Sequence, residues 1–169
     1  MDRGTVLDLL AADEAAFARD AGDLLGVEVP PLDAFDGPDD CPAWPDLLAR
    51  RKRLVRRVWL LDDAPFGVTL AGPAYEDNPV LYANRTLRGM TGYAMADLAG
   101  ENLRLLQGPD TEREAVADLH EALRTWEPTT VELTNYRADG TPFRNRVSLL
   151  PMTDDAGTVT EWFGVQERV

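Results

Sequence analysis

This chain of 169 residues contains one cysteine, one histidine and one lysine. A single cysteine, Cys41, excludes an intramolecular disulfide and any metal site built from several thiolates, and we favour a small loop residue over a reactive thiol at this position. A single histidine, His120, excludes a histidine-rich metal centre. No apolar run approaches the roughly 18 residues of a membrane span, and acidic residues occupy the N-terminal segment where a signal peptide would be apolar. We therefore expect a cytoplasmic protein without membrane contact.

Positive charge is also scarce, because 17 basic residues face 30 acidic ones and leave a formal charge of −13. A surface this acidic repels nucleic-acid phosphates, so direct nucleic-acid binding is not expected. Lys52 is the only lysine, and a high acid content with arginine in place of lysine favours adaptation to high salt, where ions screen the self-repulsion. An ordinary acidic bacterial protein is the alternative.

The first 45 residues divide into a regular and an irregular part. Residues 5–25 are rich in alanine and carry Leu10, Phe17 and Leu24 at seven-residue intervals, which predicts one helix. Residues 26–45 contain five prolines among several acids, which predicts an irregular linker.

Residues 46–61 predict a second helix with an apolar stripe at heptad-like spacing, formed by Leu47, Leu54, Val58 and Leu61. Two heptads are too few for an isolated coiled coil, so we expect the stripe to pack on the sheet or on a second copy. Six basic residues share this segment: Arg50, Arg51, Lys52, Arg53, Arg56 and Arg57. A solvated face paired with the acidic surface is favoured over a nucleic-acid patch.

From residue 62 onward the pattern changes to strands and short helices. Strands are predicted at 66–71, 80–84, 129–137, 142–153 and 158–166, with short helices over 85–107 and a longer helix over 111–126. This order resembles the PAS fold, an α+β arrangement with a five-stranded antiparallel sheet and helices over one face. The predicted organisation is a helical extension at 1–61 followed by a PAS core at 62–169.

Three carboxamide side chains stand on otherwise apolar strand faces. Two-residue alternation places Asn135, Asn145 and Gln166 on such faces, with Val147 beside Asn145. A single amide of this kind is more often structural. Three convergent amides in an apolar pocket suit a flat heteroaromatic ligand with alternating donors and acceptors along its edge, such as the isoalloxazine ring of a flavin.

The segment Gly-Glu-Asn-Leu-Arg-Leu-Leu-Gln-Gly at 100–108 resembles the flavin-binding signature of light-oxygen-voltage (LOV) domains, a branch of the PAS fold, whose usual form is Gly-x-Asn-Cys-Arg-Phe-Leu-Gln. The resemblance covers residues 66–166. Further matching segments are Leu-Gln-Gly-Pro at 106–109, Asn-Tyr at 135–136, Pro-Met at 151–152 and Gly-Val-Gln at 164–166.

The resemblance implies FMN as cofactor, with FAD as the alternative. It implies that Asn102 and Gln107 contact the ribityl chain and nearby ring, and that Arg104 pairs with the phosphate. It further implies that Asn135 and Asn145 bind the pyrimidine edge, that Gln166 lies beside N5 and O4, and that Leu103 and Val147 belong to the cofactor site.

Two positions depart from the family pattern. Leu103 stands where the family carries its photoreactive cysteine, so no flavin–cysteinyl adduct is expected. His120 stands where a second phosphate-binding arginine is common, and an imidazole lacks the permanent charge of a guanidinium. The alternative for His120 is a residue of the helix surface.

The expected function is a blue-light or redox sensor that works without an adduct. The flavin would be reduced to the neutral semiquinone, and protonation at N5 would make the amide of Gln166 rotate. Candidate electron donors are Tyr82, Tyr93, Trp126, Tyr136 and Trp162. The alternative is a PAS module for dimerisation or ligand binding that does not respond to light. No nucleophile pair or metal set points to an enzyme.

The output route is expected to start at the last strand, where Phe163 and Val165 face away from Gln166. An apolar outer face needs cover, which the helix at 46–61 would supply by folding back or by packing on a second copy. We expect a homodimer through the N-terminal helices and the outer sheet face, or an effector domain beyond Val169.

Overall fold

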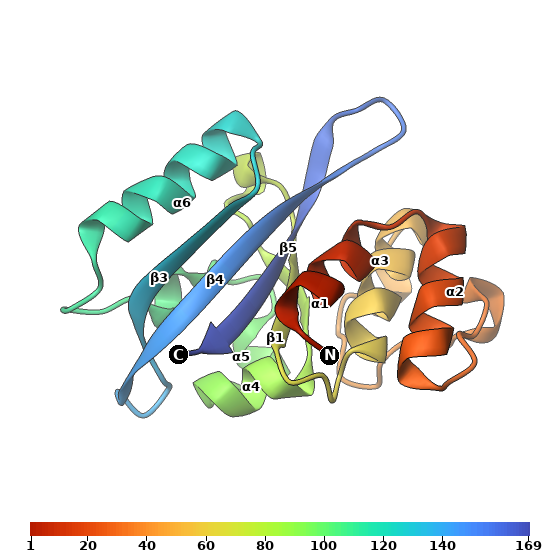
Figure 1. The fold of residues 1–169 in the computed structure, drawn as a ribbon, viewed down its shortest axis with the longest axis horizontal. Coiled ribbons are helices and arrows are strands. Elements are labelled where there is room, and N and C mark those ends of the chain that lie inside the picture. The colour runs from red at the N-terminus through yellow and green to blue at the C-terminus, as the bar shows by residue number, and fades with distance from the viewer.

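The computed structural model describes residues 1–169, with six α-helices and five β-strands (Figure 1). The strands form one antiparallel sheet in the order β2-β1-β5-β4-β3. Their bounds are Gly67–Ala71 (β1), Val80–Ala83 (β2), Thr129–Tyr136 (β3), Pro142–Thr153 (β4) and Val159–Arg168 (β5). Each lies within two residues of its prediction, and the α+β class is confirmed. None of the helices combines the length and the apolar character needed to cross a membrane.

The inner face of the sheet is covered by elements that follow β2 in the chain. They are α4 (Arg85–Thr91), α5 (Met95–Leu98), a 3-10 turn at Leu103–Leu106 and α6 (Arg113–Thr125). Helix α6 packs on β3, α4 packs on β1, and α5 packs on β2. The space between α6, the 3-10 turn and the sheet is where the predicted site residues meet.

Asn84 fixes α4 to the sheet. Its side-chain oxygen accepts hydrogen bonds from the backbone N–H of Leu87 at 3.0 Å, capping the helix, and of Val68 at 2.8 Å. Its side-chain nitrogen donates to the carbonyls of Leu61 and Phe66 at 2.8 and 2.9 Å. Because Asn84 is fully buried and both amide atoms are paired, it is a structural residue.

The outer face of the sheet is covered by α1 (Arg3–Ala11) and α3 (Ala49–Leu60). Helix α1 contacts β4 and β5, whereas α3 contacts β1 and β2, and Figure 1 shows α1, α2 and α3 gathered on the side opposite α6. Phe163 and Val165 of β5 are fully buried in one cluster with Val6 of α1 and Leu54 and Val58 of α3. The second helix therefore folds back on its own sheet, as one of the two predicted arrangements has it.

The single helix predicted at 5–25 is two helices, α1 and α2 (Glu14–Leu25). The side chain of Asp13 accepts a hydrogen bond from the N–H of Ala16 at 2.8 Å and caps α2, and an aspartate favours such a cap over a helix interior. Phe17 is fully buried, but Leu24 is 41% exposed, so the seven-residue stripe does not continue through α2. The second predicted helix begins at Ala49 rather than at 46, because Leu48 is extended.

The prediction of a solvated basic face on the second helix is wrong for two of its arginines. Arg56 and Arg57 are buried, and both contact Glu14 of α2. Arg57 also donates to the carbonyls of Leu10 and Ala12 at 2.8 and 2.7 Å. These carbonyls at the end of α1 have no partner within that helix, so Arg57 supplies the missing donors. Burial lowers the pKa of Arg57, while the bond to Glu14 opposes that shift.

Two further arginines of α3 hold the last strand. Arg50 and Arg51 donate to the two carboxylate oxygens of Glu161 on β5 at 2.9 and 3.0 Å. Glu161 is only 2% exposed, and a buried carboxylate requires such partners. Four of the six basic residues of this segment therefore pair with acids of their own chain.

Candidate functional site

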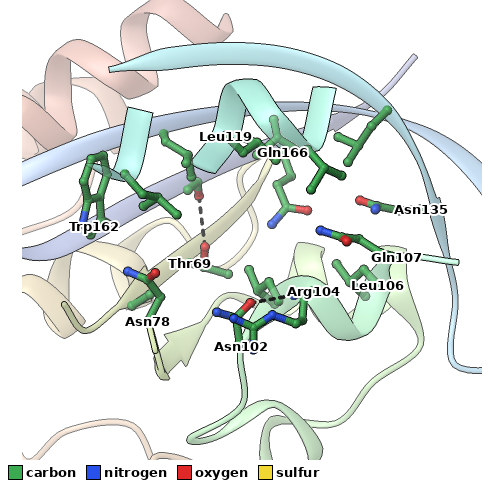
Figure 2. Close-up of a pocket in the computed structure, with 18 of the residues that line it drawn as sticks. Thr69, Asn78, Asn102, Arg104, Leu106, Gln107, Leu119, Asn135, Trp162 and Gln166 are labelled. Atoms are coloured by element: carbon green, nitrogen blue, oxygen red, sulfur yellow. Dashed lines mark hydrogen bonds between the residues drawn. The ribbon is translucent and has the colours of Figure 1, made fainter. Parts of the chain in front are cut away.

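A pocket lies between the inner face of the sheet, the 3-10 turn and α6 (Figure 2). It encloses about 170 Å³, and 10 of its 19 lining residues are hydrophobic. Its apolar wall consists of Ala71, Leu103, Leu106, Val116, Leu119, Leu123, Leu133, Val147, Leu149 and Trp162. A concave apolar pocket with a few polar groups is the usual form of a small-molecule site.

Three amides from neighbouring strands meet on the floor of this pocket. The side-chain nitrogen of Asn145 on β4 donates to Asn135 Oδ1 on β3 and to Gln166 Oε1 on β5, both at 2.8 Å. All three side chains are at least 96% buried, and Asn135 and Gln166 line the cavity. The register of the sheet pairs Gln166 with Val147, two residues after Asn145. The side chains of Asn145 and Gln166 therefore lie on the same face of neighbouring strands.

One polar atom of this floor has no partner. Asn145 Oδ1 is buried and accepts no hydrogen bond, and an orphan buried acceptor costs about 1–3 kcal/mol. Asn145 does not itself line the cavity, but it is bonded to Asn135 and Gln166, which do, and an N–H on the edge of a flat heteroaromatic ring would satisfy its free acceptor. The amide donors and acceptors of this floor therefore fit the pyrimidine edge of a flavin.

Gly164 keeps the floor of the pocket open on β5. A Cβ at this position would lie 2.6 Å from Thr69 Oγ1, which is too close for any side chain. Gly164 and Thr69 both line the pocket, and Figure 2 draws the bond from the Thr69 hydroxyl to the Gly164 carbonyl. A bare backbone here leaves room for a planar group to lie against the sheet.

The signature segment forms the opposite wall. Asn102 caps the 3-10 turn, accepting from the N–H of Arg104 at 2.8 Å, and its side-chain nitrogen donates to the Asp77 carbonyl at 2.8 Å. The guanidinium of Arg104 is paired with the carboxylate of Asp77, with Nη1 at 2.7 Å from Oδ2. His120 reaches the pocket from α6.

Eight of the nine predicted site residues line this one pocket: Asn102, Leu103, Arg104, Gln107, His120, Asn135, Val147 and Gln166. Asn145 lies behind them and reaches the pocket through its hydrogen bonds. The sequence reasoning missed Thr69 and Asn78, which also line the cavity. Two-residue alternation along β1 would have found Thr69, whereas the position of Asn78 depends on a turn.

Of the aromatic residues considered as electron donors, only Trp162 lines the pocket. Tyr82 faces the N-terminal linker, where its hydroxyl donates to Asp40 at 3.2 Å. Cys41 is also outside the pocket; its buried thiol donates weakly to the Leu81 carbonyl at 3.8 Å, and burial raises the pKa of the thiol.

A five-stranded antiparallel sheet with helices enclosing a pocket on its inner face defines a PAS-type fold. The sequence model of the PAS domain family matches residues 65–167, and the chain belongs to that family. A solved LOV structure from a study of a flavin analogue superposes with a TM-score of 0.62 at 38% identity, covering 64% of this chain and 81% of that one.

Two curated relatives extend the comparison. The bacterioopsin transcriptional activator of Halobacterium salinarum is 39% identical over 124 residues, which are 73% of this chain and 18% of that protein. Blue-light-activated histidine kinase 1 of Erythrobacter litoralis is 39% identical over 99 residues, or 59% of this chain and 28% of the kinase. The chain therefore spans less than a third of either protein.

Proposed function

We propose that this chain is a LOV-type sensory domain that binds a flavin and responds to blue light or redox state without a cysteinyl adduct. The observation that carries the proposal is the floor of three buried amides with an unpaired Asn145 Oδ1. Similarity to a solved LOV domain and to a blue-light-activated kinase supports it.

In this proposal the amide floor holds the polar edge of the ring. With the ring bound, Asn135 would donate to a ring carbonyl, and Asn145 Oδ1, which lies behind Asn135 and Gln166 in this structure, would accept the ring N–H. The cavity of about 170 Å³ is smaller than the roughly 300–1,000 Å³ of typical ligand sites. We therefore expect Leu119 and Leu123 of α6 to move outward when the ring enters.

The outer part of the pocket holds the flavin tail. Asn102 and Gln107 bind the ribityl hydroxyls, and Arg104 with His120 holds the phosphate of FMN, while FAD would extend its second nucleotide into solvent. All four side chains line the same cavity. Leu103 contributes apolar contact alone.

The bound flavin supplies blue-light absorption and takes up one electron and one proton. Because Leu103 offers no nucleophile, the chain contributes an electron donor and a proton-sensitive hydrogen bond. Trp162, which lines the pocket, would supply the electron, an external reductant such as a thiol would restore it, and water would supply the proton. With a flavin bound, Gln166 would present its amide nitrogen to an accepting N5 and its amide oxygen to a protonated N5.

The rotation of Gln166 reaches the N-terminal helices through β5. Glu161 and Phe163 on the other face of this strand contact that layer, so a change in Gln166 alters the contact between the extension at 1–61 and the core at 62–169. We propose that the output is a changed homodimer contact through these helices, or through an effector in a longer protein.

The test is the absorption and emission of the purified protein before and after blue light, with and without a mild reductant. A blue flavin band that bleaches into a neutral-radical spectrum and recovers in air is the expected result. Trp162→Phe should slow the bleaching when no reductant is added, whereas Trp126→Phe, at an exposed position outside the pocket, should not.

Two outcomes contradict the proposal. A flavin that stays bright and unchanged under light and reductant indicates the alternative PAS module without a light response. A colourless protein that takes up no added FMN removes the flavin altogether.

A further inference from the structure

The rim of the pocket carries an ion pair that the flavin chemistry does not explain. Arg104 and Asp77 face each other as two forks, with Arg104 Nη1 2.7 Å from Asp77 Oδ2 and Nη2 bonded to Oδ1. Their side chains are 55% and 64% exposed, so the pair stands at the mouth, where a charged ligand tail would emerge. An aspartate is already ionised at neutral pH, and the hydrogen bond to Arg104 lowers the pKa of Asp77 further.

The position of Asp77 is set by its backbone. Asp77 and Asn78 are consecutive non-glycine residues with positive φ, at 68° and 46°. The turn is fixed by hydrogen bonds from Asp77 N to the Ala74 carbonyl and from Asn78 N to the Pro73 carbonyl, both at 3.0 Å. Aspartate and asparagine are the side chains that adopt this left-handed conformation most readily, so the turn forms without a glycine. The hydrogen-bonded turn therefore fixes the position of the Asp77 carboxylate beside Arg104.

The charges that a ligand would meet at this rim nearly cancel. Arg104 is the only lysine or arginine among the lining residues, and no acid lines the cavity. Asp77 neutralises Arg104 from outside, and the whole chain carries −13. The phosphate of a ligand would therefore meet the Arg104 guanidinium already paired with Asp77, and the negative carboxylate of Asp77 would repel it.

We propose that Asp77 competes with the ligand's phosphate for Arg104, so that the pocket discriminates only weakly between FMN and phosphate-free riboflavin. This inference rests on the proposed flavin binding. In the proposal Asp77 is a specificity residue, because it acts on the ligand through Arg104 and touches neither the ring nor the amide floor.

Binding of riboflavin and FMN to the flavin-stripped full chain, followed by fluorescence titration, tests the competition. We expect the wild type to bind the two ligands within about threefold of each other. Asp77→Asn should raise FMN affinity roughly five- to tenfold, from the lost repulsion of a divalent phosphate, and leave riboflavin within about twofold. Asparagine accepts positive φ, so the turn is kept.

Two matched variants complete the test. Asp155→Asn at an exposed hairpin tip makes the same change in net charge and should leave both affinities unchanged. Arg104→Gln should weaken FMN binding more in the Asp77→Asn background than in the wild type, because only there is the guanidinium free.

Several results would overturn the competition. A fall in FMN affinity in Asp77→Asn makes Asp77 a positioning residue for Arg104, and an equal change for both ligands assigns it to the shape of the turn. If FMN and riboflavin bind unequally in the wild type but Asp77→Asn changes nothing, only this inference fails. If folded wild type and variant bind neither ligand, the proposed flavin binding fails.

Discussion

Leu103 decides which chemistry the pocket can support. The residue lies in the 3-10 turn after Asn102, lines the cavity and packs against the main core cluster. A thiolate at such a place could add to an excited ring, whereas a branched alkyl group cannot. Cys41, the one thiol of the chain, is buried outside the pocket, so no thiol of this chain lies at the proposed flavin site.

Leu103→Cys should therefore introduce a light-driven adduct. Illumination of the flavin-loaded variant should remove the blue absorption band and the emission together, without radical bands, because the new thiol adds to the ring. Time-resolved absorption follows both species. Leu106→Cys, in the same turn and also lining the pocket, serves as control and should keep the wild-type response. A Leu103→Cys protein that still yields only the radical would show that residue 103 does not face the reactive carbon.

At the residue scale, the sequence predicted where the three amides lie on their strands but did not predict the burial of two arginines. Asn135, Asn145 and Gln166 follow from two-residue alternation, because a strand side chain has only two faces to choose from. The burial of Arg56 and Arg57 depends on where the carbonyl end of α1 lies. That position is set by tertiary packing, and no local pattern encodes it.

At the scale of elements, β5 links the pocket to the N-terminal helices. Trp162 and Gln166 point into the pocket, whereas Phe163 and Glu161 face the other side. Two arginines of α3 hold Glu161. A strand that belongs to both layers can transmit a displacement, because packed cores and interfaces do not deform smoothly.

Glu161→Gln should loosen this contact. The variant keeps the shape of the side chain but removes the buried charge that pairs with Arg50 and Arg51, so we expect a loss of about 1–3 kcal/mol in the free energy of unfolding in urea. Glu132→Gln, which breaks a half-exposed pair with Arg146 on the sheet, should cost no more than about 1 kcal/mol.

Limited proteolysis locates the change made by Glu161→Gln. Trypsin should cut within the arginine-rich helix α3 sooner in this variant than in Glu132→Gln. Equal stabilities and equal cleavage rates in the two variants would mean that Glu161 does not hold α3 on the strand.

The junction of α6 and β3 should depend on pH through Glu112. Its carboxylate accepts the Thr134 N–H at 2.6 Å and pairs with Arg144. The Thr134 N–H is the largest cause of the lowered pKa of Glu112. With the folded pKa below the usual value of about 4.3, the contribution to stability is present above about pH 4.3 and is lost as pH falls through the folded pKa.

Thermal unfolding of Glu112→Gln and wild type between pH 7 and pH 3 measures this contribution. The difference in stability should shrink as the pH falls, and the effect should be small because solvent reaches the Glu112 side chain, which is 41% exposed. A difference that grows toward pH 3 would contradict the assigned sign.

The arrangement of the elements was predicted where the local pattern has one solution. All five strands follow from turns and alternation. The break between α1 and α2 was missed because the alanine-rich composition and the seven-residue spacing of apolar residues continue across it, as they would in a single helix. The place of α1 on β4 and β5 was also missed. Val6, Leu9 and Leu10 form an apolar face of α1, but an apolar face alone does not indicate which element it packs against.

At the scale of the whole molecule, the excess of negative charge is the main feature that bears on stability. Thirty acids against 17 basic residues leave −13 on 169 residues. Many of the arginines are already engaged in ion pairs, including those from Arg50 and Arg51 to Glu161 and from Arg88 to Asp40. The unpaired acids therefore repel one another across the surface, which opposes the compact state.

The melting temperature should therefore rise with sodium chloride concentration. Raising the ionic strength from 0.1 M to 1 M shortens the screening length from about 10 Å to about 3 Å. This removes most long-range repulsion, while pairs with a buried partner such as Glu161 are screened less. A triple variant with Asp36, Asp39 and Asp155 changed to asparagine loses three of the negative charges that make up the net charge of −13. It should melt higher than the wild type at 0.1 M and gain less from added salt. Differential scanning calorimetry measures both proteins, and a wild type whose melting temperature is flat or falls with salt would show that ion pairing outweighs the net charge.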